Sequence, residues 1–373
     1  MMVLAIVLLT ALCLAYANGA NDNFKGVATL FGSGTANYRG ALAWATLTTF
    51  LGSLTAVFLA EQLLKSFSGR GLVDKSLTSD PRYLAAVALG AGLTVLLATR
   101  VGMPVSTTHA LVGALVGAGW AAGSMINFAN LGAQFFLPLL TAPVVALAVT
   151  MVCYVLFHQA RTRLGVLEQT CFCVGHETVD VVPCLSPAVS LQRIEQLTVT
   201  LGNEVTCHNR YHGAVLGIQA SLVLDWLHYL SAGIVSFARG LNDTPKIAAL
   251  LLVLPGLRGW GGLVLVALFM AAGGILSARK VAETLSGKIT SMNHGQGFTA
   301  NLVTGAIVIL ASTFQVPVST THVSCGAMFG LGTITGQAHW GMIRKILAAW
   351  VTTLPAGAVL GAAAQGCIQL LAV

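Results

Sequence analysis

Long apolar stretches restrict the fold of this sequence more than any other feature. They cover residues 3–17, 41–60, 83–99, 135–157, 215–237, 261–277, 298–314 and 346–373. Most of them reach the roughly 17–25 residues that a helix needs to cross a bilayer. Only 8% of the residues are charged, against about 25% in soluble domains, which is too few to coat a surface in water. The sequence therefore predicts a multi-pass integral membrane protein.

These membrane spans are expected to be helices. The strands of a transmembrane barrel alternate with period two in segments of about ten residues, and the sequence shows no such alternation. Shorter apolar pieces follow Lys25, Thr108, Pro245 and Thr321. We therefore predict an all-α polytopic membrane protein with about 10–12 transmembrane helices, a number that includes broken or re-entrant segments.

The first apolar stretch ends in "LAYA" and has some features of a secretory signal peptide. No Lys or Arg precedes it, however, and the polar segment behind it recurs behind another apolar stretch in mid-chain. We therefore expect residues 3–17 to remain in the protein as a membrane span.

Basic residues outnumber acidic ones, and the net charge is +7. They are scattered singly through the loops, which does not indicate a nucleic-acid partner. Membrane topology and an anionic solute account for them better. Lys and Arg show no decisive bias between alternate loops, so the orientation in the membrane stays open.

Two motifs occur twice, in the same order. "GANDNFKGVATLF" from Gly19 aligns with "GLNDTPKIAALLL" from Gly240, and "MPVSTTHALVGALVGAG" from Met103 aligns with "VPVSTTHVSCGAMFGLG" from Val316. Such self-similarity indicates two homologous halves. We assign residues 1–157 to the first membrane repeat and 211–373 to the second, with a polar, cysteine-containing insert at 158–210 between them.

Gly, Pro and polar residues interrupt the matching apolar segments of both halves. This pattern is typical of secondary transporters with two inverted-topology repeats, whose broken helices meet near the midplane and bind solute there. Asp22 and Lys25 would each cost about 2.5–3.5 kcal/mol at a bilayer centre. We therefore expect them to face protein, water or solute.

The "PVSTTH" motifs predict two helix starts. Proline suits the first turn of a helix, and the serine after it suits the N-cap. The exposed N–H groups, the positive helix pole and the hydroxyls would suit a tetrahedral oxyanion. Capping alone is the alternative, but the duplication favours anion binding. The predicted substrate-binding residues here are Ser106, Thr107, Thr108, Ser319, Thr320 and Thr321.

His109 and His322 follow the threonines in the two copies. We favour an orienting hydrogen bond from each ring to a neighbouring backbone group. A direct role with the substrate or with a proton is the alternative.

The two "N-D-x-x-K" segments place an acid and a lysine three residues apart, where they share a helix face and can pair. Mutual neutralisation is one interpretation. In the other, the acids bind a driving cation or a proton and the lysines offset the charge of the solute. The asparagines would offer amide oxygens to a cation or amide donors to an oxyanion. These residues are Asn21, Asp22, Lys25, Asn242, Asp243 and Lys246.

The acids also bear on the solute. Hydrogen phosphate carries an O–H group and can donate to a carboxylate, whereas sulfate has no proton at neutral pH. Two aspartates beside the anion site therefore favour phosphate, and sulfate is the alternative.

The insert holds four of the eight cysteines. Their spacing matches no standard zinc motif, so unligated thiols are the favoured interpretation, with a metal site or disulfides as alternatives. Weak metal candidates are Cys171, Cys173, His176 and Cys207. No cofactor is predicted.

With these motifs, together with "ARKVAETLSGKIT", both halves of the chain resemble the inorganic phosphate transporter (PiT) family, which includes sulfate permeases. The resemblance implies a cation-coupled symporter with inverted repeats, in which the Ser-Thr-Thr turns and Asn-Asp pairs hold the anion. Many members carry Asn where this chain has Lys25. A fixed ammonium there would occupy the space of a bound sodium ion, so sodium and proton remain alternatives as the coupling ion.

An intramembrane hydrolase that uses His109 or His322 with Asp22 is the alternative from another class. An enzyme needs one asymmetric set of acid and base roles, and every candidate here is duplicated, so no enzyme is predicted. The expected partners are phosphate or sulfate and the lipid bilayer, with a homodimer left open. The short insert suggests a prokaryotic protein of the inner (cytoplasmic) membrane.

Overall fold

The computed structural model describes residues 2–59, 64, 67–167, 170–181, 192–203, 216–257 and 259–371. These residues form two compact units. One unit combines Met1–Tyr154 with His228–Val373, and the other is Val155–Leu227.

Within these residues, 8 helices are long and apolar enough to cross a membrane. They are Met2–Asp22, Tyr38–Phe58, Pro81–Arg100, Phe128–Arg163, Ala220–Leu251, Trp260–Ser277, His294–Thr313 and Trp340–Leu370. Each overlaps one of the apolar stretches recognised in the sequence. The predicted polytopic helical fold is therefore confirmed, and the protein is an integral, multi-pass membrane protein.

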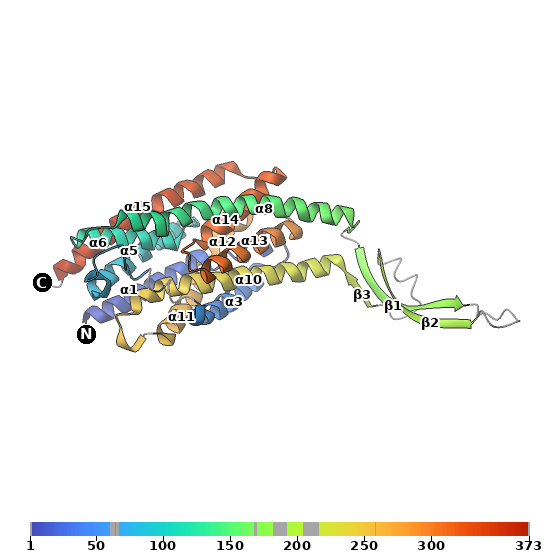
Figure 1. Ribbon diagram of the computed structural model, residues 1–373, viewed down its shortest axis with the longest axis horizontal. Coiled ribbons are helices and arrows are strands. Elements are labelled where there is room, and N and C mark those ends of the chain that lie inside the picture. The colour runs from blue at the N-terminus through green and yellow to red at the C-terminus, as the bar shows by residue number, and fades with distance from the viewer. Residues whose placement is uncertain are drawn as a thin grey trace. The chain divides into compact units, whose positions relative to one another are not determined.

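Helices follow one another in a similar order in the two halves (Figure 1). The first half contains α1 (Met2–Asp22), α2 (Ala28–Gly32), α3 (Tyr38–Leu59), α5 (Pro81–Arg100), α6 (Thr107–Ala121), α7 (Phe128–Asn130) and α8 (Leu137–Arg163). The second contains α10 (Ala220–Ala248), α11 (Trp260–Ser277), α12 (Arg279–Gly287), α13 (His294–Thr313), α14 (Thr320–Thr335) and α15 (Trp340–Leu371). Short 3-10 turns at Leu77–Ser79, Ala249–Leu251 and Pro255–Leu257 and a π-helical stretch at Leu131–Phe136 complete the series.

The two halves pack closely against each other through equivalent glycines. A Cβ atom on Gly19 of α1 would lie 1.9 Å from the carbonyl oxygen of Met270 in α11, and one on Gly240 of α10 would lie 2.1 Å from that of Thr49 in α3. Small residues allow such close backbone contact between membrane helices. The helix that carries the Asn-Asp pair thus packs against a span of the other half in both cases.

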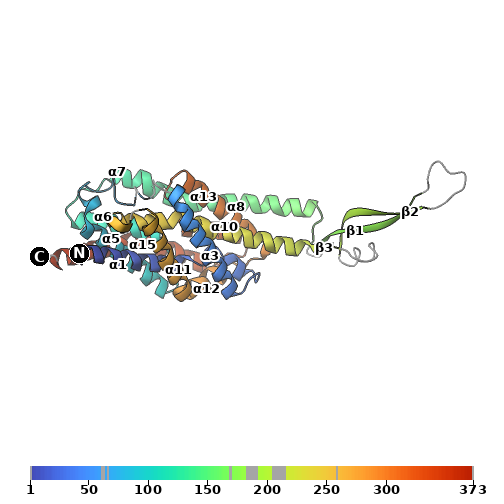
Figure 2. The same ribbon diagram turned by 90° about the horizontal axis from the view of Figure 1, so that it is seen from below.

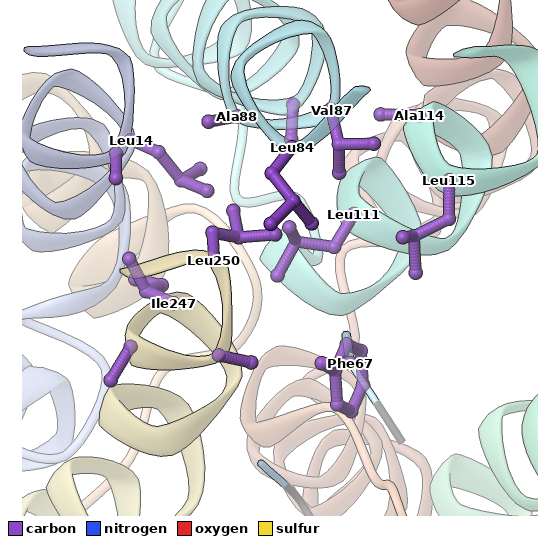
Figure 3. Packing of buried hydrophobic residues seen from close by; sticks show 14 of the residues in the cluster. Leu14, Phe67, Leu84, Val87, Ala88, Leu111, Ala114, Leu115, Ile247 and Leu250 are labelled. Carbon is purple, nitrogen blue, oxygen red and sulfur yellow. The ribbon is translucent and has the colours of Figure 1, made fainter. Parts of the chain in front are cut away.

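Side chains of both halves share one hydrophobic core. Figure 3 shows Leu14 of α1, Leu84 of α5 and Leu111 of α6 converging on Ile247 and Leu250, which come from the second half. These side chains are at most 1% exposed. The halves are therefore packed as one body and do not form two separate bundles.

The insert contributes β1 (Thr170–Val181) and β2 (Gln192–Asn203) to a three-stranded antiparallel sheet (Figure 2). The third strand, β3 (Leu216–Gln219), lies just beyond the insert, at the start of the predicted second repeat, and the strand order is β2-β1-β3. The sequence analysis did not anticipate strands here. The all-α description therefore holds for the membrane spans, and the sheet is an addition to it.

The cysteines of the sheet differ from one another. Cys171 is free, whereas Cys173 is disulfide-bonded, so the expectation of unligated thiols is wrong for Cys173. Spacing along the sequence did not distinguish these two cysteines. Cys207 and the side chain of His176 lie outside the described residues. Within the described part of the chain, no group of three or more His, Cys, Asp or Glu could hold a metal ion.

Candidate functional site

The two "PVSTTH" motifs begin helices as predicted. The Ser106 hydroxyl caps α6 by accepting a hydrogen bond from the backbone N–H of His109 at 3.1 Å. The Ser319 hydroxyl caps α14 by accepting one from the N–H of His322 at 3.2 Å. Both caps have extended backbone angles, as N-caps do. The two helix starts are therefore built alike.

The residues singled out in the sequence are buried without exception, with exposed fractions between 0% and 4%. They are Asn21, Asp22, Lys25, Ser106, Thr107, Thr108, Asn242, Asp243, Lys246, Ser319, Thr320 and Thr321. Buried charges require partners, and these residues supply them to one another.

Lys25 lies in the turn after α1 and binds groups from both halves. Its ammonium donates to the carboxylate of Asp22 and to the hydroxyl of Thr321 in α14. It also donates to the carbonyl oxygen of Val105, just before α6, at 3.1 Å. Because Thr321 belongs to the second half, this lysine joins the two halves.

Lys246 makes the equivalent contacts from the second half to the first. Its ammonium lies 3.2 Å from the carboxylate of Asp243 and 2.9 Å from the hydroxyl of Thr108 in α6. It also donates to the carbonyl oxygen of Val318, just before α14, at 2.7 Å. The local pairing of Asp with Lys in both motifs is therefore present, and each pair reaches a helix start of the other half.

The first threonine of each turn binds the aspartate of its own half. Thr107 donates from its hydroxyl to Asp22 at 3.2 Å, and Thr320 donates to Asp243 at 3.3 Å. Each carboxylate thus accepts from both a lysine and a threonine. The Ser-Thr-Thr turns and the Asn-Asp segments form one cluster, which we call the central polar cluster.

The two asparagines of the motifs have different surroundings. The amide of Asn21 donates to Thr99 and to the carbonyl of Met103, and its oxygen accepts from the N–H of Val105 at 3.1 Å. The amide of Asn242 donates to Asp243 at 3.0 Å and to the carbonyl of Val318 at 3.2 Å, while its oxygen has no hydrogen-bond partner among the described residues. Each asparagine therefore holds the segment that leads into the helix of its own half, and only Asn21 does so through its oxygen as well.

Arg239 is a buried member of the cluster that the sequence analysis missed, with 1% exposure. Its guanidinium donates to the side chains of Asn18 at 2.7 Å and Asn23 at 3.0 Å. Its Nε atom is 3.9 Å from an Asp243 oxygen and has no hydrogen-bond partner among the described residues. A lone arginine four residues before Asp243, at the end of an apolar stretch, was the available signal.

Asn18 and Arg239 occupy equivalent positions, each directly before the glycine of its motif. The Asn18 amide donates to Asp22 and to Thr107, both at 3.0 Å. The second half carries a cation where the first carries a neutral amide, and this is the main chemical difference between the halves of the cluster.

The charges of the cluster do not cancel. Among the described buried residues, Asp22 and Asp243 bring two negative charges, and Lys25, Lys246 and Arg239 bring three positive ones. One positive charge is left without a counter-charge when all five groups are ionised. An uncompensated buried charge is costly, so the cluster is suited to hold an anion.

His109 and His322 lie next to the cluster. Nδ1 of His322 is 3.3 Å from the carbonyl oxygen of Leu139, and the His109 ring is in edge-to-face contact with the His322 ring. The favoured interpretation, an orienting contact with a backbone group, is confirmed for His322. Asp22 is bound to a lysine, a threonine and Asn18, and no contact joins it to a histidine within the described residues.

Comparison with known proteins gives consistent matches over nearly the whole chain. The model of the phosphate transporter family matches residues 18–361. The chain is 27% identical over 406 residues to a Pyrococcus abyssi protein that is named as a phosphate permease, with 96% of each chain covered. It is also 27% identical over 375 residues to a Rhizobium meliloti protein that is named as a low-affinity inorganic phosphate transporter, covering 97% of this chain and 95% of the relative.

The fold has a counterpart among solved structures. A structure described as the sodium-dependent phosphate transporter superposes with a TM-score of 0.75 at 21% sequence identity, covering 99% of this chain and 100% of the other. At this level of identity the match establishes a common fold.

Proposed function

Because the chain belongs to the phosphate transporter family, we propose that it is a symporter that moves inorganic phosphate across the membrane together with a cation. The chain is a transporter and not an enzyme, as its family and relatives are. Its relatives come from archaea and bacteria, which favours the cytoplasmic membrane of a prokaryote as its location.

The observation that carries this proposal is the excess positive charge of the central polar cluster. In the described part of the chain, three buried cations face two buried anions, and Nε of Arg239 has no hydrogen-bond partner there. The hydroxyls of Thr108 and Thr321 and the two ammonium groups lie around the junction of the halves. A phosphate ion there would supply the missing negative charge and accept from these donors.

Phosphate fits the cluster better than sulfate. Asp22 and Asp243 accept hydrogen bonds and have no proton to donate while they are ionised. A protonated phosphate can donate its O–H group to one of them, whereas sulfate meets only repulsion. A sulfate permease is therefore the second choice, and competition by excess sulfate against labelled phosphate distinguishes the two.

The contacts between the halves support alternating access. Lys25 of the first half binds Thr321 of the second, and Lys246 of the second binds Thr108 of the first. We assign the halves to inverted-topology repeats that rock against each other about this shared site. The phosphate would replace part of these lysine contacts and be released when they re-form.

The lysines favour a proton as the coupling ion. Each aspartate already neutralises a tethered ammonium, which in turn is bound to a hydroxyl and a carbonyl oxygen. A sodium ion would need these same oxygen atoms and would be repelled by the ammonium. A proton needs no such set of ligands.

Uptake of radiolabelled phosphate into proteoliposomes tests the proposal. We expect uptake by the wild type, and loss to background in Asp22→Asn and Asp243→Asn, because each change leaves a buried lysine unpaired. Glu283→Gln is the matched control, since this acid is exposed and paired with Arg279 at 3.3 Å, and it should keep its uptake. Robust uptake in both aspartate variants would contradict the proposal.

Sodium and proton gradients imposed separately on the same vesicles test the coupling ion. The tethered ammonium groups predict stimulation by an inward proton gradient and the same uptake when choline replaces sodium. Uptake that requires sodium would overturn the choice of the proton and leave phosphate transport intact.

A further inference from the structure

His109 and His322 are two imidazoles in contact, one from each half of the chain. Their ring centroids are 4.4 Å apart and the rings meet edge to face, with an interplanar angle of 78°. They directly follow Thr108 and Thr321, whose hydroxyls bind the lysines of the central polar cluster. A pair of titratable rings therefore lies beside the proposed phosphate site.

The backbone fixes the tautomer of one ring of the pair. Nδ1 of His322 contacts the carbonyl oxygen of Leu139, which can only accept, so this nitrogen carries the hydrogen. A neutral imidazole has one N–H group and one bare lone pair. Nε2 of His322 is therefore the nitrogen that can take a proton.

One nitrogen of each ring is unused. Nδ1 of His109 and Nε2 of His322 are buried, and neither has a hydrogen-bond partner among the described residues. Leaving a buried acceptor unpaired destabilises a fold. The phosphate site proposed above uses neither atom, and no contact in the described residues compensates for leaving them unpaired.

The surroundings can stabilise a positive charge on this pair when an anion is present. The indole of Trp350 lies over His322, with centroids 3.9 Å apart, and the face of an indole attracts a cation. From α8 the neighbour is the Leu139 backbone, and further along α14 lies the free, buried thiol of Cys325. The titratable group in contact with His322 is His109. Lys25 binds Thr321, the residue directly before His322, and its like charge opposes a positive charge on the pair.

This repulsion links the proton to phosphate. An anion bound beside Lys25 offsets the lysine charge, so a proton is accepted more readily by the histidines when phosphate is present. By thermodynamic reciprocity, the proton then strengthens phosphate binding by the same factor. Such mutual strengthening is what a symporter requires of its two solutes.

We propose that His109 and His322 together form the binding site of the coupling proton. A lone pair of the imidazole pair takes one proton from the water of the donor side and returns it on the acceptor side, and no other bond changes. His109 is partly exposed, whereas His322 is 2% exposed, so the proton reaches the pair through His109. This inference rests on the proposed function.

Substitutions by amide side chains test the pair. A glutamine amide can replace Nε2, and an asparagine amide can replace Nδ1. His322→Asn therefore keeps the N–H group that Leu139 holds. His109→Gln and His322→Asn each replace the basic lone pair of a ring nitrogen by an amide oxygen, which is not protonated near neutral pH. His228→Gln is the matched control, because that buried ring has Thr29 and Thr35 as partners at 3.0 and 3.3 Å and lies outside the proposed sites.

The readout is phosphate accumulation in proteoliposomes under an inward pH gradient, compared with phosphate counterflow at equal pH. A gradient of one pH unit should drive about tenfold accumulation per coupled proton in the wild type and in His228→Gln. The double variant should show an accumulation ratio near one while counterflow is still measurable. Accumulation by the double variant at the wild-type level would overturn the proposal.

The remaining outcomes are also decisive. If the double variant loses counterflow, the single variants are measured, and loss of counterflow in both of them would show that the rings are structural and overturn the proposal. If the wild type shows counterflow but ignores the pH gradient, this inference fails and phosphate transport stands. If the wild type moves no phosphate at all, the proposed function itself fails.

Discussion

The two halves of the central polar cluster are nearly the same in their contacts and differ in one charge. In each half a lysine binds its own aspartate, a threonine of the other half and the carbonyl of the valine before the serine N-cap. The position before the motif glycine is Asn18 in the first half and Arg239 in the second. Duplication thus provides the framework, and a single divergent position sets the net charge.

This comparison separates two roles. The repeated contacts join the halves in two equivalent places, which suits the alternating access proposed here. The divergent arginine makes the cluster electropositive, which suits the proposed binding of an anion. Substitutions in matched pairs test the first role, and substitution of Arg239 alone tests the second.

The largest effect is expected from Arg239→Met. It removes the excess charge and leaves Asp243 with one cation fewer, and breaking a buried ion pair costs about 3–5 kcal/mol. Phosphate uptake should fall by more than about a hundredfold. Initial rates in proteoliposomes measure this, with Arg279→Met as the control, because that arginine is 80% exposed. Uptake within a few-fold of the wild type would refute the role assigned to the excess charge.

The lysines are expected to give the next effect. Lys25→Met and Lys246→Met each leave one buried aspartate without its ammonium and break one contact between the halves. Uptake should fall by at least about tenfold in each, and by comparable factors, because the contacts match. If one variant transported normally while the other was inactive, the contacts of Lys25 and Lys246 between the halves would not be equivalent.

Equivalent glycines give a smaller and purely structural effect. Valine at Gly19 or Gly240 would collide with the backbone of Met270 or Thr49, and overpacking typically costs about 1–3 kcal/mol. The thermal midpoint of the purified protein should fall in both variants. Gly341→Val is the control, since no atom lies within 4 Å of the added Cβ. An unchanged midpoint in Gly19→Val would show that α1 and α11 can separate at little cost.

The smallest effect is expected at the helix caps. Ser106→Ala and Ser319→Ala remove one capping hydrogen bond each, a loss worth about 0.5–2 kcal/mol of unfolding free energy. Denaturant unfolding of the reconstituted protein measures it. Since the two caps are alike, the two variants should lose similar amounts of unfolding free energy. A clear difference between these losses would show that the two helix starts are not equivalent.

Local patterns in the sequence were sufficient for much of this architecture. The long apolar stretches predicted the eight long spans, and the "PVSTTH" motifs predicted both serine caps. The burial of the duplicated acids and lysines, with the threonines beside them, also followed. A charged side chain within an apolar membrane segment must face protein, water or solute and not lipid. These features depend on residues close together in the chain.

The features that the sequence did not reveal depend on contacts between distant residues. Repetition drew attention to matching positions, so Arg239 and its partner Asn18, which do not match, were missed. The reach of Lys25 to Thr321 and of Lys246 to Thr108 depends on how the halves pack. The three-stranded sheet depends on pairing between strands that are distant in the sequence, and the spacing of the cysteines did not show that Cys173 is disulfide-bonded.

A structure of the protein with bound arsenate, a tetrahedral analogue of phosphate that can be located by its anomalous scattering, tests the central claim most directly. The excess buried charge predicts an arsenic atom within hydrogen-bonding reach of Thr108, Thr321 and the two lysines. Arsenate bound elsewhere, with the central polar cluster unchanged, would contradict the account.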